Sequence, residues 1–185
     1  MMTAMTGCLF TRSGYESAPY RSVRQVGKFE LRDYPALTVV ETPMKESSTG
    51  SDVGFSRLFR FISGHNTQER KIAMTTPVFM SRREGEPMMA FVMPANIKPL
   101  ELPAPDDESL KVRQLPTGRF AVLRFSGQRS LEQENQALQQ LETWMRDNNL
   151  APSGSPIFGY FDPPWTPPFM RRNEVMLRTS SEPLR

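Results

Sequence analysis

The chain of 185 residues contains one cysteine, Cys8, and one histidine, His65, and these counts restrict its chemistry. An internal disulfide needs two cysteines, while zinc clusters and two-histidine metal centres need several Cys or His ligands. A Ser-His-Asp triad would have to use His65, and no G-x-S-x-G motif accompanies it. Enzymatic function therefore receives little support from the residues.

An enzyme that acts on an apolar ligand nevertheless stays open as one possibility. It would need an acidic or phenolic side chain that is buried in a groove and titrates abnormally, and Glu30, Glu41 and Tyr34 are the candidates. The adjacent acids at 106–108 lie in the segment "LPAPDDES", whose prolines are typical of a solvated loop.

Apolar residues after position 52 recur with the spacing i, i+3, i+4 and i+7, which predicts a short amphipathic helix. These residues are Phe55, Leu58, Phe59 and Ile62. Ser51 and Asp52 can cap the start of the helix, and Gly64 ends it. Such a stripe can either pack into a core or line an apolar groove, and both interpretations remain open at this point.

Strands are predicted on both sides of this helix, because the flanking segments alternate between apolar and polar residues. Residues 29–44 form two short strands that break at Tyr34-Pro35, and residues 70–94 form a hairpin. Pro77 cannot donate a ladder hydrogen bond, so we expect it at an edge, at a bulge or where the strand leaves the sheet.

The second half of the chain repeats this order of elements. Residues 110–127 are predicted as strands with a break at Leu115-Pro116, and a helix capped by Ser130 follows. The apolar stripe of that helix consists of Leu131, Leu138, Leu141 and Met145. The final strands are "SPIFGYF" and "NEVMLRT". Two β-helix-β-β halves predict an α+β fold, a distorted antiparallel β-barrel flanked by two main helices.

The length of the chain is consistent with one domain, which we place at 20–179, with tails at 1–19 and 180–185. The net charge of +3 is spread along the chain, which does not favour nucleic-acid binding. No window has the roughly 18 apolar residues of a spanning helix.

The N-terminal segment "MTGCLFTRSGYESAPY" resembles the end of a bacterial lipoprotein signal, in which the cysteine is lipidated. The seven residues before Cys8 contain neither a basic region nor an apolar region of the usual length. As written, the sequence predicts a soluble, cytoplasmic protein. The alternative is a lipid-anchored cell-envelope protein, if translation starts upstream.

Two long segments, "KIAMTTPV" and "YFDPPWTPPFMRRNEVML", carry a family resemblance. The first is similar to the signature Lys-Ile-x-Met-Thr-x-Pro-Val of the SOUL haem-binding protein family, and the second is similar to the closing segment of that family. The resemblance extends in the same order from about Tyr20 to Thr179. It implies a distorted β-barrel built from two repeats with two helices.

The resemblance also implies that the chain binds haem or another tetrapyrrole in an apolar groove between the first helix and the sheet. Phe55, Leu58, Phe59 and Ile62 would line the groove, and Arg57 and Arg60 would reach the propionates. His65 is a candidate axial ligand, and Met74 of the signature is a candidate contact. Weak ligation would make the protein a carrier or buffer without redox function. The alternative is a small-molecule sensor or protein-interaction module.

The segment "DPPWTPPF" has two interpretations. It could serve as a polyproline II ligand for a partner, or it could form an ordered loop. We favour the loop, with Trp165 and Phe169 packed against the barrel and Arg171, Arg172 and Glu174 fixing it through ion pairs or hydrogen bonds to backbone.

Overall fold

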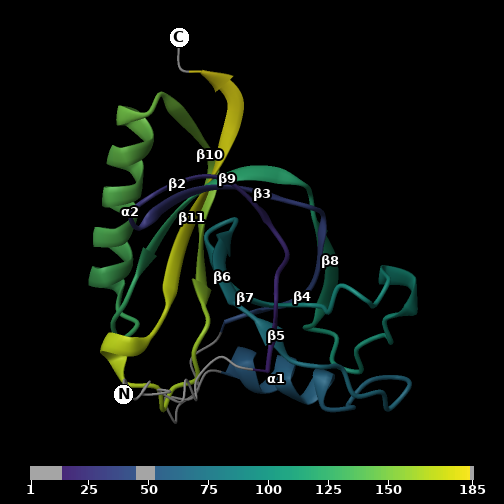
Figure 1. The fold of residues 1–185 in the computed structure, drawn as a ribbon. Coiled ribbons are helices and arrows are strands. Elements are labelled where there is room, and N and C mark those ends of the chain that lie inside the picture. The colour runs from purple at the N-terminus through teal and green to yellow at the C-terminus, as the bar shows by residue number, and fades with distance from the viewer. Residues whose placement is uncertain (1–13, 45–52, 184–185) are drawn as a thin grey trace, which may run out of the picture.

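The computed structural model describes residues 14–44 and 53–183, which form a curved sheet with both helices packed against its outer, convex face (Figure 1). The elements in chain order are β1 (Glu16–Ser17), β2 (Arg21–Val26), β3 (Phe29–Tyr34), β4 (Leu37–Pro43), α1 (Val53–Ile62), β5 (Thr75–Thr76), β6 (Val78–Arg83), β7 (Glu86–Val92), a 3-10 turn η1 (Pro99–Glu101), β8 (Lys111–Leu115), β9 (Gly118–Phe125), α2 (Leu131–Asp147), β10 (Leu150–Tyr160), a second 3-10 turn η2 (Pro168–Met170) and β11 (Asn173–Pro183).

The main sheet has nine strands in the order β2-β3-β9-β11-β10-β6-β7-β4-β8. All of its neighbouring pairs are antiparallel, whereas the short strands β1 and β5 form a separate parallel pair. The predicted α+β class with an antiparallel sheet and two main helices is therefore confirmed.

The predicted barrel is not observed, because the sheet stays open. Its edge strands β2 and β8 do not pair with each other. The side chains of β2 are all exposed, and those of β8 are exposed except for the half-buried Leu115. Neither edge offers an apolar face that closure would bury, so the curvature ends before the edges meet.

Prolines interrupt the strands where the sequence predicted. The breaks at Tyr34-Pro35 and Leu115-Pro116 separate β3 from β4 and β8 from β9. Pro77 follows a cis peptide bond and lies between β5 and β6, so the alternating segment leaves one pairing and enters another at this residue.

Side chains alternate between the two faces of the sheet and build three apolar clusters. One lies under α1 and contains Leu58, Phe61 and Phe91. Another lies under α2 and contains Leu141 and Val175. The third lies on the concave face and joins strands of both halves. Its members are Ala18, Tyr34, Leu37, Val39, Phe79, Ala90, Val92, Val122 and Met176. The curvature therefore encloses a core of its own.

Helix α2 begins as predicted, because the Ser130 hydroxyl accepts a hydrogen bond from the Gln133 backbone N–H at 3.2 Å. Leu141 and Met145 are buried against the sheet, as the stripe predicted. Leu131 is 70% exposed instead, because it is the first residue of the helix, and Ala137 completes the buried face.

Ordered contacts are also present on both sides of residues 20–179. The backbone N–H of Ala18 donates to the Thr76 carbonyl at 2.8 Å, and the buried Ala18 follows the β1–β5 pair. At the other end β11 continues to Pro183. Cys8 and the predicted caps Ser51 and Asp52 lie outside the described residues. Within the described ranges, no helix has the length and apolar character needed to cross a bilayer.

Replacement of Leu141 by Ala should lower the free energy of unfolding by about 3 kcal/mol, because this side chain of α2 is fully buried between the helix and the sheet. The matched control on the same helix is Leu131→Ala, which should change it by less than about 0.5 kcal/mol. Urea unfolding followed by circular dichroism measures both values. Equal effects of the two substitutions would contradict the packing of α2.

Candidate functional site

Helix α1 buries a different set of side chains from the predicted stripe. Leu58, Phe61 and Ile62 are buried against the sheet, whereas Phe55 and Phe59 are 41% and 50% exposed. Successive residues are ~100° apart around a helix, so Phe61 falls within the buried face while Phe55 and Phe59 fall at its margin. Leu58 and Ile62 are thus core residues, and the two phenylalanines form a surface.

The exposed phenylalanines form a compact aromatic surface, which we call the α1 aromatic surface. The rings of Phe55 and Phe59 stack at 6.0 Å with an interplanar angle of 11°. Phe55 also meets the buried Phe91 edge-on at 5.4 Å. Met74 is half-buried and packs against the cluster that contains Phe91. The surface is therefore continuous with the core beneath α1.

The two arginines of α1 do not both face this surface. Arg57 Nε lies 3.6 Å from Asp107 Oδ2, in the loop before β8. The pKa of Asp107 is lowered by hydrogen bonds from the side chain and backbone of Ser109, with a further contribution from the charges of Arg57 and Arg60. Asp107 therefore offsets part of the positive charge that Arg57 carries. Arg60 is exposed in the last turn of the helix.

His65 lies just beyond the end of α1 and is exposed. Its Nδ1 lies 3.3 Å from the backbone oxygen of Arg60. A carbonyl oxygen only accepts hydrogen bonds, so the neutral tautomer that fits this contact has its proton on Nδ1 and a lone pair on Nε2. Histidines that ligate metals commonly have this arrangement, with the outer ring nitrogen left to bind the ion.

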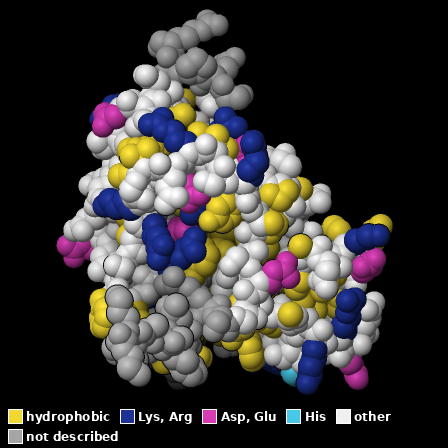
Figure 2. Space-filling view, viewed as in Figure 1, with side chains coloured by type: hydrophobic (Ala, Val, Ile, Leu, Met, Phe, Trp, Pro, Cys, Tyr) yellow, Lys and Arg dark blue, Asp and Glu magenta, His cyan; other side chains and the backbone are white. Residues whose placement is uncertain are grey.

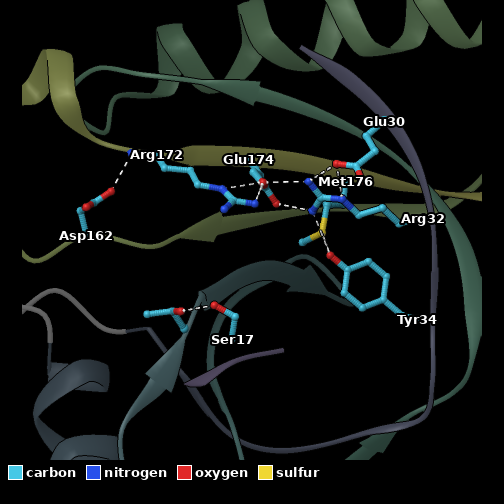
Figure 3. A network of polar contacts seen from close by, with 9 residues as sticks. Ser17, Glu30, Arg32, Tyr34, Asp162, Arg172, Glu174 and Met176 are labelled. Carbon is cyan, nitrogen blue, oxygen red and sulfur yellow. Dashed lines mark hydrogen bonds and ion pairs between the residues drawn. The ribbon is translucent and has the colours of Figure 1, made fainter. Parts of the chain in front are cut away.

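The concave face holds a buried ionic network that the sequence did not predict (Figure 3). Glu174 on β11 has no solvent exposure and pairs with Arg32 on β3, with Oε2–Nη1 and Oε1–Nη2 distances of 2.7 and 3.0 Å. Arg172 donates from Nε to Glu174 Oε1 at 2.9 Å, and Arg32 Nε donates to Glu30 Oε2 at 2.8 Å. The Arg172–Glu174 pair agrees with the prediction from the closing motif.

Charge compensation within this network shifts the pKa values of its members. Burial opposes the charge of Arg32, but hydrogen bonds and charges from Glu174 and Glu30 outweigh it and raise its pKa. Burial would raise the pKa of Glu30, but hydrogen bonds from Arg32 and Ser22 and the nearby arginine charges lower it. Burial raises the pKa of Tyr34 to about 12, with Arg32 opposing. Both arginines and Glu30 are thus held in their charged forms.

The pKa shifts of Glu30 and Tyr34 are relevant to the possible enzyme that acts on an apolar ligand, because both residues were candidates for its acid or base. The pKa values of Glu30 and Tyr34 both move away from neutrality, which does not favour either group as a general acid or base at neutral pH. Glu41 is buried and accepts hydrogen bonds from both Arg83 Nη groups, with Arg113 Nε 2.7 Å away. All three candidates therefore belong to ion-pair networks.

A small apolar hollow lies beside the network. Its lining consists of Tyr34, Pro35, Leu37, Phe79, Leu115, Pro116, Phe120, Ile157 and Met176. The free space within it is about 20 Å³. One water molecule needs roughly 10–15 Å³ measured in this way, so the hollow as it stands cannot contain a large planar ligand. Among the described residues, no cluster of His, Cys, Asp and Glu side chains could hold a metal ion.

The Pro-rich connection between β10 and β11 differs from its prediction. Arg171 Nε donates to the Thr166 carbonyl at 2.7 Å and Nη2 donates to the Pro164 carbonyl, so the predicted hydrogen bonds to backbone are present. Trp165 and Phe169 do not pack against the sheet, however, because they are 79% and 78% exposed. The arginine, rather than aromatic burial, fixes this loop.

Solved structures share the antiparallel architecture described above. The C-terminal domain of EcmrR is 12% identical, with a TM-score of 0.59 and coverage of 87% of this chain and 98% of that one. A structure described as a hydrolase from Listeria innocua is 11% identical, with a TM-score of 0.64 and coverage of 85% and 94%. An uncharacterized conserved protein from Listeria innocua is 12% identical, with a TM-score of 0.65 and coverage of 83% and 92%. At these identities the likeness establishes the fold alone.

The sequence, unlike the fold, identifies the family of the chain. The family described as SOUL heme-binding protein matches residues 15–178, which is most of the chain. The chain therefore belongs to the SOUL haem-binding protein family, as its two motifs predicted. Among curated proteins there is no match.

Sequence reasoning missed the Arg32–Glu174 pair because the two residues lie 142 positions apart. A signal was nevertheless present. Glu30, Arg32 and Tyr34 alternate along β3, so the period of a strand places them on one face, opposite Leu31. A strand face that carries an acid, a base and a phenol inside a folded domain requires partners of opposite charge.

Replacement of Glu174 by Gln should destabilise the protein by about 3 kcal/mol, because it removes the fully buried carboxylate that faces Arg32 and leaves Arg32 paired with Glu30 alone. Asp33→Asn is the control, since Asp33 pairs with Arg21 and Arg119 at the surface and should cost about 1 kcal/mol or less. Urea unfolding at neutral pH measures the difference. Similar costs for both variants would argue against the network as a stabilising element.

Tyr34 should make stability depend on pH in alkaline solution. The folded protein raises its pKa from 10.0 to about 12, so the fold favours the protonated phenol. This contribution is fully present below pH 10 and is lost as the pH rises toward 12. Between pH 10 and 12, the free energy of unfolding of the Tyr34→Phe variant should therefore fall less than that of the parent protein. Parallel slopes for the two proteins, in urea unfolding at stepped pH, would contradict the assignment.

Proposed function

We propose that the protein binds haem or a related tetrapyrrole on the α1 aromatic surface and acts as a carrier or buffer without redox function. The stacked and exposed pair of Phe55 and Phe59 carries this proposal. A planar apolar ring gains contact area on such a surface, and offset aromatic stacking adds to the burial of apolar area. The family of the chain supports the choice of ligand class.

The residues present fit a loosely held ring. Phe55 and Phe59 would contact its face, and Met74 would support the cluster beneath. Arg60 would pair with a carboxylate of the ring, whereas Arg57 would first have to give up part of its contact with Asp107. His65 Nε2 would be the nitrogen available to an iron atom. When bound, haem iron would supply a coordination position that exchanges its ligands. A single exposed histidine favours reversible binding over a permanent centre.

The second candidate is a small-molecule sensor or interaction module of the same fold. The apolar hollow on the concave face favours it, because aromatic and methionine side chains converge there beside a buried carboxylate network. The sheet would have to open to admit anything larger than water, so binding of a compact apolar ligand would be coupled to a change in curvature.

Haemin titration of the whole chain, followed by absorbance, tests the first proposal. We expect saturable one-to-one binding that is lost in the Phe55→Asp/Phe59→Asp variant, because charged side chains would replace the surface that the ring covers. His65→Ala should shift the absorbance spectrum and weaken binding by about tenfold, a cost of ~1.4 kcal/mol. Leu100→Asp is the matched control, since Leu100 is fully exposed elsewhere.

Two results would reject this site. One is unchanged haemin affinity in the double aspartate variant, provided that its circular dichroism matches the parent. The other is equal loss of binding in the Leu100→Asp control, which would indicate non-specific adsorption. Failure of the parent chain to bind haemin at all would leave the sensor or interaction module as the better proposal.

A further inference from the structure

The loop between β10 and β11 exposes large apolar side chains in an unusual concentration. Trp165, Phe169 and Met170 are 79%, 78% and 45% exposed. Single exposed apolar residues are normal on a protein surface, but a Trp and a Phe in one proline-rich loop require an explanation. In Figure 2 hydrophobic atoms protrude at the lower left, where Figure 1 places η2.

This exposure is built into the loop. Besides the two Arg171 hydrogen bonds to the carbonyls of Pro164 and Thr166, the Gly127 backbone N–H donates to the Pro168 carbonyl at 3.0 Å. Thr166, between the two aromatic residues, is buried and directs the loop inward at that point. The aromatic side chains are thus carried on a fixed backbone, which reduces the entropy lost when they bind a partner.

Basic residues surround the same loop. A shallow hollow beside η2 is lined by Lys28, Arg124, Phe125, Ser126, Phe169, Met170 and Arg171. This described lining contains three cations and no carboxylate. Lys28 donates to the neutral Gln140 side chain, and Arg171 donates to backbone carbonyls, so these contacts leave their charges uncompensated. The exposed Phe169 and Met170 of the loop therefore have a positively charged border.

We propose that this face, formed by Trp165, Phe169, Lys28 and Arg124, binds the surface of an anionic phospholipid membrane. Trp is favoured at the boundary between headgroups and acyl chains, because its ring is apolar and its N–H is polar. Cations next to such residues attract the phosphate groups of anionic lipids. The charge of the border selects an anionic surface, and the protruding aromatic tips suit a soft bilayer. This inference is independent of what α1 binds.

The test uses the whole chain with vesicles of phosphatidylcholine alone and vesicles of equimolar phosphatidylcholine and phosphatidylglycerol. Sedimentation measures binding, and fluorescence in a Trp144→Phe background reports on Trp165 alone. We expect binding to the anionic vesicles only, with a blue shift of the Trp165 emission. Trp165→Ala/Phe169→Ala should weaken binding by about tenfold or more. Lys28→Gln/Arg124→Gln should weaken it about fivefold per charge removed and reduce its salt dependence.

Matched controls are Leu100→Ala for the apolar residues and Arg82→Gln/Lys98→Gln for the charges, all at exposed positions elsewhere. They should bind anionic vesicles as the parent does. Absence of binding to anionic vesicles would overturn the proposal, as would equal binding to neutral ones or unchanged binding by the loop variant. Capture of a protein partner that depends on Trp165, without lipid binding, would assign the face to that partner instead.

Discussion

Glu174 has no contact with solvent, and an isolated carboxylate in such a position would cost far more than a domain of this size can tolerate. Arg32 and Arg172 make its burial possible, and they come from different parts of the chain. Because β9 lies between β3 and β11, the pair between Arg32 and Glu174 spans a strand and fixes the relative positions of three strands. It also places the Tyr34 hydroxyl, which accepts from Arg32 at 3.1 Å. The concave face is therefore organised by charge at one side and by apolar packing at the other.

This organisation determines where a ligand can bind. The concave face is nearly filled by its own side chains, and its hollow has room for about one water molecule. The outer surfaces are different, because a short helix such as α1 can bury only part of its circumference. Two of its phenylalanines remain at the margin of the packed face. The strongest apolar features open to a ligand in the described residues are thus Phe55 and Phe59 on α1 and the loop that carries Trp165.

Local pattern predicted the elements well, since strand alternation, helical spacing and proline breaks are properties of neighbouring residues. Tyr34-Pro35, Leu115-Pro116 and Ser130 all marked element boundaries correctly. Which apolar side chains are buried was harder to predict. Phe55, Phe59 and Phe61 are the same residue type within one helix, and only the position of the sheet decides that Phe61 is buried. Trp165 was expected to pack against the sheet because its segment resembles the closing motif of the family, yet the side chain is exposed and an arginine holds its loop. Closure of the sheet also depends on edges that no local pattern reveals.

The strand order has a consequence for how the chain folds. Each half of the sheet contains strands from both halves of the chain, since β2 and β3 precede β9 at one end and β8 pairs with β4 at the other. Neither half can complete its sheet alone, so the halves are not independent folding units. Most of the pairings join residues far apart in sequence, which is typical of slow folding through high contact order. A cut between β7 and β8 would separate the β2–β3 pair from the other strands in one product and leave β8 without its partner in the other. We therefore expect folding to be cooperative over the whole domain.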